Sequence, residues 1–89
     1  MFSESSLFWV VAHPLFFLLV IACDAIPNED FEVELAVYAG RQLGKEIIWV
    51  ESFAVEGCTL DDIGELEELA YEVAESPALV KKAERVLGV

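Results

Sequence analysis

Carboxylates are the side chains in this sequence whose spacing is best suited to chemistry. Between residues 61 and 75, acidic residues recur every three or four positions, which places them on one face of an α-helix. These residues, called the acidic stripe below, are Asp61, Glu65, Glu68, Glu72 and Glu75. No Lys or Arg lies among them, so neighbouring charges repel at about 0.2–0.5 kcal/mol per pair. The stripe is either a solvated face that maintains solubility or a surface that binds a basic partner.

Thiol chemistry has little support in the sequence. Cys23 and Cys58 are the only cysteines, without a CxxC spacing, which is typical of small buried thiols. Cys58 precedes an expected helix, whose N-terminus lowers a thiol pKa. Its base would have to be His13, the only histidine, and no local sequence feature links the two residues. We therefore expect no catalytic residue.

Metal and cofactor motifs are also missing from the sequence. It contains no HExxH, no paired Cys/His ligand spacing and no EF-hand loop, and it lacks GxGxxG, GxxxxGK and GxSxG. We expect no metal site, no cofactor and no enzymatic activity.

Composition limits the class of protein and of partner. The chain has 89 residues, 17 acidic against 5 basic, for a net charge of −12, yet 56% of it is hydrophobic. This apolar content excludes a disordered acidic chain, and the length predicts one domain over residues 1–89. Direct binding to nucleic acid is not expected, because few cations would neutralise the phosphates. The apolar excess predicts a homo-oligomer, whose interface would be the sheet face opposite the helices or residues 7–23, and the charge predicts a basic protein partner.

Residues 7–23 form an almost uninterrupted apolar segment. It reads LFWVVAHPLFFLLVIAC, and its hydropathy approaches that of a transmembrane helix, which would extend over residues 7–26. However, the first forty residues contain no Lys or Arg to orient a span, and Pro14 would disrupt the helix. The other interpretation divides the segment at His13-Pro14 into strands over residues 7–12 and 15–23.

The end of this segment supports a second kind of membrane attachment. Val20-Ile21-Ala22-Cys23 resembles the lipobox of bacterial lipoprotein signal peptides, which implies lipidation of Cys23. The resemblance covers four residues and lacks the basic region that precedes a lipobox. The alternative function is therefore a small single-span or lipid-anchored membrane protein with an acidic α/β headpiece.

Residues 31–55 read as a β-hairpin. Apolar residues alternate with acidic or polar ones from Phe31 to Tyr38, and a second strand follows from residue 47 to residue 55 after a turn that contains Gly40 and Gly44. The period of two places Trp49 and Phe53 on the face of Ile47 and Val55. Glu51 falls on the same face, so we expect it at the rim of the sheet with a partner.

Two helices are predicted after the hairpin. Thr59 and Asp62 have the spacing of a capping box, which starts a helix over about 59–75. Its expected buried stripe is Leu60, Ile63, Leu66, Ala70 and Val73, and Gly64 marks close packing, a frayed first turn or a kink. Ser76 as N-cap, Pro77 at the first helical position and Gly88 at the end predict a second helix over about 77–87.

The order of these elements suggests a fold class and a function. A hairpin followed by a helix resembles the opening of ubiquitin-like β-grasp domains, from which no function is transferred. We predict an α+β fold in which a small, mainly antiparallel sheet over residues 7–55 is covered on one face by the two helices. The predicted function is binding or inhibition of a basic protein through the acidic stripe, and one form of this hypothesis is nucleic-acid mimicry. The expected location is the cytoplasm, and the alternative location is a membrane.

Overall fold

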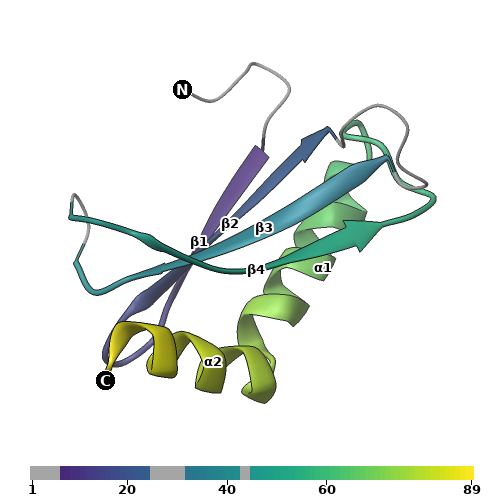
Figure 1. The fold of residues 1–89 in the computed structure, drawn as a ribbon. Coiled ribbons are helices and arrows are strands. Elements are labelled where there is room, and N and C mark those ends of the chain that lie inside the picture. The colour runs from purple at the N-terminus through teal and green to yellow at the C-terminus, as the bar shows by residue number, and fades with distance from the viewer. Residues whose placement is uncertain (1–6, 25–31, 43–44) are drawn as a thin grey trace.

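The chain folds into a four-stranded sheet followed by two helices. The computed structural model describes residues 7–24, 32–42 and 45–89. The elements are β1 (Leu7–Ala12), β2 (Phe17–Asp24), β3 (Val33–Gly40), β4 (Ile48–Val55), α1 (Ile63–Glu75) and α2 (Pro77–Leu87). Neighbouring strands pair antiparallel in the order β1-β2-β3-β4, and both helices lie on one face of the sheet (Figure 1). The predicted α+β architecture is confirmed.

The apolar N-terminal segment forms the first two strands. β-Branched and aromatic residues favour the extended backbone, and Pro14 lies in the turn between β1 and β2, where the His13 N–H donates to the Phe16 carbonyl at 2.8 Å. The alternative helix over residues 7–26 is therefore wrong for residues 7–12 and 17–24. In the described part of the chain, no helix is long and apolar enough to cross a membrane. The tetrapeptide that resembles a lipobox lies within β2.

The core lies between the sheet and the helices. Alternate residues of the two central strands face the helices and are fully buried, among them Leu18 and Val20 in β2 and Leu35 and Val37 in β3. The helices contribute two leucines and three alanines to the buried core, namely Leu66, Ala70, Ala74, Leu79 and Ala83. Alanine brings the helix backbones close to the sheet, which gives a dense core in a short chain.

α1 begins later than the sequence predicts. Thr59 and Asp62 do interact, because the Thr59 N–H donates to Asp62 Oδ2 at 2.8 Å, but residues 59–62 form a turn and the helix starts at Ile63. Ile63 is 53% exposed rather than part of the core. Gly64 has open space where a Cβ would be, so it is a residue of the first turn and not a site of close packing.

A β-bulge changes which residues of β4 share a face. Val37 pairs with Glu51 and Tyr38 pairs with Trp49, so Val50 is an extra residue. The bulge places Trp49 opposite Tyr38, on the other face from Phe53. The prediction that Trp49 and Phe53 share a face is therefore wrong, because one inserted residue inverts the alternation.

Gly40 ends β3 at a point of close contact. A Cβ at Gly40 would lie 2.7 Å from Cζ of Phe17, so the glycine makes room for that ring. Gly44, the other glycine of the predicted turn, lies outside the described residues.

α2 has the predicted bounds. Ser76 occupies the N-cap position without a side-chain hydrogen bond, Pro77 is the first helical residue, and Gly88 ends the helix in the left-handed conformation at φ +74°. Because both helices follow a complete four-stranded meander, the topology differs from that of a β-grasp domain.

Candidate protein-binding surface

The acidic stripe lies on the solvent side of α1. Leu66, Ala70 and Ala74 are fully buried and define the inner face of this helix. At 100° per residue, Glu68 and Glu72 project from the opposite side. All five stripe residues are exposed, four on α1 itself and Asp61 in the turn before it. The structure thus brings the predicted residues together on one surface.

The stripe has no cationic partners in the described part of the chain. Residues 7–24, 32–42 and 45–89 contain one ion pair, between Lys82 Nζ and Glu51 Oε1 at 2.7 Å. This contact joins α2 to the rim of the sheet and confirms the expected position of Glu51. No cation in this part of the chain therefore offsets the repulsion between the carboxylates of α1.

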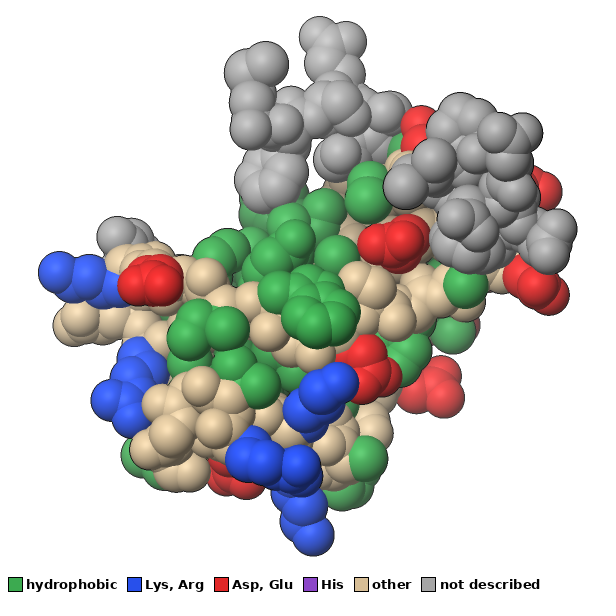
Figure 2. All heavy atoms as spheres, in the orientation of Figure 1, with side chains coloured by type: hydrophobic (Ala, Val, Ile, Leu, Met, Phe, Trp, Pro, Cys, Tyr) green, Lys and Arg blue, Asp and Glu red, His purple; other side chains and the backbone are tan. Residues whose placement is uncertain are grey.

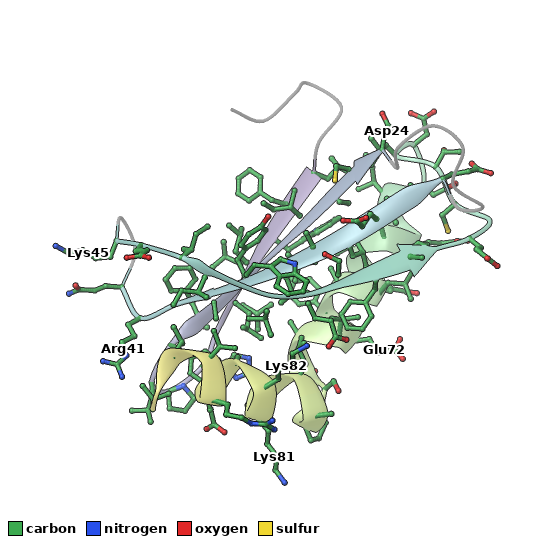
Figure 3. The ribbon with its side chains drawn as sticks, viewed as in Figure 1. Asp24, Arg41, Lys45, Glu72, Lys81 and Lys82 are labelled. Atoms are coloured by element: carbon green, nitrogen blue, oxygen red, sulfur yellow. The ribbon has the colours of Figure 1, made fainter. Side chains whose placement is uncertain are left out.

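Positive charge lies in other parts of the molecule. The five cations are Arg41 and Lys45, in the connection between β3 and β4, and Lys81, Lys82 and Arg85, on α2. Figure 3 shows Arg41 and Lys45 at one end of the sheet, and Asp24 and Glu72 on the other side of the molecule. In Figure 2 most acidic side chains lie toward the right and the basic ones toward the left and bottom. The molecule therefore has an acidic side and a basic side.

One stripe residue also holds a thiol. Cys58 is buried, and its Sγ donates to Glu65 Oε2 at 3.1 Å. This hydrogen bond raises the pKa of the Cys58 thiol, and burial and the charges of Glu65 and Asp62 raise it further. The position before a helix therefore does not activate this thiol, because the neighbouring groups stabilise the protonated form.

The structure keeps Cys58 and His13 apart. Cys58 contacts the start of α1, whereas His13 Nε2 donates to the carbonyl oxygen of Ala74 at 3.1 Å, near the end of the helix. Glu65 and Ala74 are nine residues apart on α1, which separates the two contacts by roughly 14 Å, at about 1.5 Å per residue. No nucleophile and base pair forms between them. Both cysteines are free thiols, and the pKa of Cys23 is raised, mainly by burial and then by the charges of Glu34 and Asp24.

Two cavities lined by described residues bring no reactive groups together. A cavity of about 150 Å³ between β4 and α2 contains the Glu51 and Lys82 ion pair. An open hollow of about 520 Å³ beside the turn between β1 and β2 has mostly apolar walls with Arg41 at its margin. Within the described residues, no group of three or more His, Cys, Asp or Glu side chains is arranged to hold a metal ion.

A second surface lies on the face of the sheet away from the helices, where the sequence predicted an interface for self-association without naming its residues. Most strand residues that point there are apolar or aromatic, and we call the surface formed by eight of them the open face. They are Phe8, Val10, Phe17, Leu19, Ile21, Ala36, Tyr38 and Trp49. The signal was available in the uninterrupted apolar run of β2, but the position of Trp49 depends on the bulge.

Comparisons of the chain with protein-family models, with curated proteins and with solved structures found no match. The function is therefore inferred from the chemistry of these surfaces.

Proposed function

We propose that this protein is a small binding protein that engages a basic protein through the acidic stripe and inhibits it by occupying its basic surface. The observation that carries the proposal is a row of five exposed carboxylates with no cationic partner among the described residues. A stripe that served only the stability of the helix would alternate in sign, because unlike charges four residues apart stabilise a helix and like charges destabilise it. Here the repulsion is retained.

The charge distribution suits long-range attraction. Because the cations lie on α2 and in the connection between β3 and β4, the acidic side of the molecule presents an electrostatic field of one sign to an approaching partner. Such a field speeds association by about 10- to 1,000-fold and orients the partner before contact. Because the charges are exposed, salt weakens the interaction.

The density of charge on α1 favours a partner whose own ligand is a nucleic acid. Four stripe residues on α1 span ten helical steps, about 15 Å at 1.5 Å per residue, namely Glu65, Glu68, Glu72 and Glu75. This is roughly one negative charge every 5 Å along the helix axis, compared with about 3.4 Å per phosphate along one DNA strand. The stripe therefore mimics one strand of phosphates and competes for the surface that binds them.

The test compares two variants of equal net charge. One carries Glu65→Lys, Glu68→Lys and Glu72→Lys, and the other carries Asp24→Lys, Glu46→Lys and Glu56→Lys at exposed positions outside α1. Both have a net charge of −6 instead of −12. The probe is a fluorescent Lys/Arg-rich peptide, and its anisotropy is titrated with each protein at about 50 and 300 mM NaCl, concentrations between which exposed charges become largely screened.

The parent and the second variant are expected to bind the peptide at low salt, and the stripe variant at least about tenfold more weakly. Equal losses in both variants would show that net charge alone attracts the peptide, and the stripe would then not be the site. A DNA duplex is added last, and the mimicry proposal requires that it displace the parent from the peptide.

A further inference from the structure

The open face is an apolar surface on a chain of high negative charge. Phe8 and Trp49, on the two outer strands, are 58% and 53% exposed, and Val10 is 46% exposed. Between them lie the side chains of the central strands, with Ile21 and Ala36 forming the floor. Figure 2 shows hydrophobic side chains gathered in the middle of the molecule, between its basic and acidic parts.

The sequence of the first two strands is that of strands covered on both faces. An antiparallel strand with one face in water alternates apolar and polar residues, whereas β1 reads LFWVVA and β2 reads FLLVIACD. The helices cover the face that contains Leu18 and Val20. The same composition on the other face is explained by a second layer packed against it.

The charge pattern favours a second copy as that layer. In the four described strands, Glu34 is the only charged residue that faces the open side, since Asp24 pairs with Val33 and Glu51 with Val37, on the helix side. From α2, the Lys82 ammonium reaches the edge of this face, 5.8 Å from the centre of the Trp49 ring. Two copies that meet here keep their acidic stripes on opposite outer surfaces. This arrangement buries apolar side chains while it keeps the repulsion between the two stripes small. No other face of the described chain combines these properties.

The area is sufficient for a dimer. An aromatic side chain presents about 150–250 Å², so the two outer aromatic rings expose roughly 200 Å² and the whole open face on the order of 500 Å². Two such faces bury about 1,000 Å² in total, the lower limit for a specific interface. This area predicts a reversible dimer of modest affinity.

We propose that two copies of this chain pack open face against open face and form a closed, two-fold symmetric dimer. The sheets form the two inner layers and the helices the two outer layers of the assembly. The dimer presents two acidic stripes on opposite surfaces. On the proposed function above, it can therefore hold two basic partners, or two sites of one partner if they are suitably placed.

The test compares the same substitution on two surfaces. Val10→Lys places a cation of each copy in the interface, whereas Val86→Lys introduces the same change on α2, where Val86 is 37% exposed and lies away from the open face. Sedimentation velocity of the full chain and both variants is measured over about 1–200 µM. Circular dichroism and thermal melting establish that each variant is folded.

We expect the parent and Val86→Lys to approach twice the 9.9 kDa mass of one chain as concentration rises, and Val10→Lys to dimerise at least about 100-fold more weakly. Dilution of the parent is also expected to shift the tryptophan emission to longer wavelength as Trp49 becomes exposed, a readout that needs no variant. A parent that stays monomeric throughout, an assembly larger than a dimer, or equal behaviour of the two variants would overturn the proposal.

Salt separates this inference from the proposed function. Screening reduces repulsion between two chains of charge −12, so dimerisation strengthens with NaCl, whereas binding of the cationic peptide weakens. The variant with three charge reversals on α1 is expected to remain a dimer, and Val10→Lys to retain peptide binding. Each proposal can therefore fail without the other.

Discussion

The repulsion within the acidic stripe predicts that one substitution stabilises the fold and weakens binding together. Glu68 lies in the middle of α1, exposed, with Glu65 three residues before it and Glu72 four residues after it. Glu68→Lys converts two repulsive pairs into two attractive ones. At about 0.2–0.5 kcal/mol for each repulsion removed and each attraction gained, the sum is about 0.8–2 kcal/mol at low salt. We expect about 1 kcal/mol after screening, equivalent to roughly 4–8 °C in the melting temperature of a chain of this size.

The assay is urea and thermal unfolding at about 20 and 500 mM NaCl, with two controls. Glu68→Gln removes the repulsions without adding attractions, so about half of the gain is expected. Glu56→Lys makes the same change in net charge at an exposed position outside the helices, and its effect should stay within about 0.5 kcal/mol. The difference between the two lysine variants should shrink at high salt, because exposed pairs are screened.

The reasoning is refuted if Glu68→Lys is no more stable than Glu56→Lys at low salt. The same Glu68→Lys protein should bind the cationic peptide more weakly than the parent, since it removes a carboxylate from the proposed contact. A residue that weakens the fold while serving the contact is the expected pattern for a functional surface.

Two further predictions concern particular residues. Gly64→Ala should raise the free energy of unfolding by about 0.5–1 kcal/mol, because the position is helical and has open space for a Cβ. Gly88→Ala should lower it by about 1 kcal/mol, because Gly88 has φ +74°. Urea unfolding measures both changes, and changes of the same sign would contradict this account. Because the hydrogen bond to Glu65 raises the pKa of Cys58 above that of a free thiol, the folded state holds its proton more tightly. The resulting stability is present below pH 9 and is lost as pH rises through the folded pKa; Cys58→Ala should therefore flatten the alkaline decline in stability, and an unchanged slope would argue against the hydrogen bond to Glu65.

Local patterns were sufficient to predict most of the fold. Backbone geometry within a few residues determines three features. These are the turn at His13-Pro14 between two strands, the alternation after residue 31, and the bounds of the last helix at Ser76-Pro77 and Gly88. The same holds for the four stripe residues on α1, which helical spacing alone places on one face, whereas Asp61 lies in the turn before the helix. The capping-box signal located the Thr59 and Asp62 interaction, but a turn and the start of a helix share that hydrogen bond, so the helix began four residues later.

The errors occurred where packing decides. An extra residue at Val50 inverts the alternation of β4, and nothing near Trp49 in the sequence distinguishes a regular strand from a bulged one. Ile63 was also predicted to be buried, because its side chain is more hydrophobic than that of Ala74. However, α1 contacts the sheet along the line of Leu66, Ala70 and Ala74, and Ile63 stays exposed.

The sequence by itself determined that charge and apolar residues are segregated along the chain, and that residues 61–75 carry an acidic face if helical. It left open whether residues 7–23 form a helix or strands, because a continuous apolar run has no period to distinguish them. Only the tertiary structure decided this, by pairing β2 with β1 and β3 and by packing the helices on one face of the sheet. That arrangement separates the acidic side from the cations and leaves an apolar face on the other side, because burial depends on which elements meet and local propensity does not specify it.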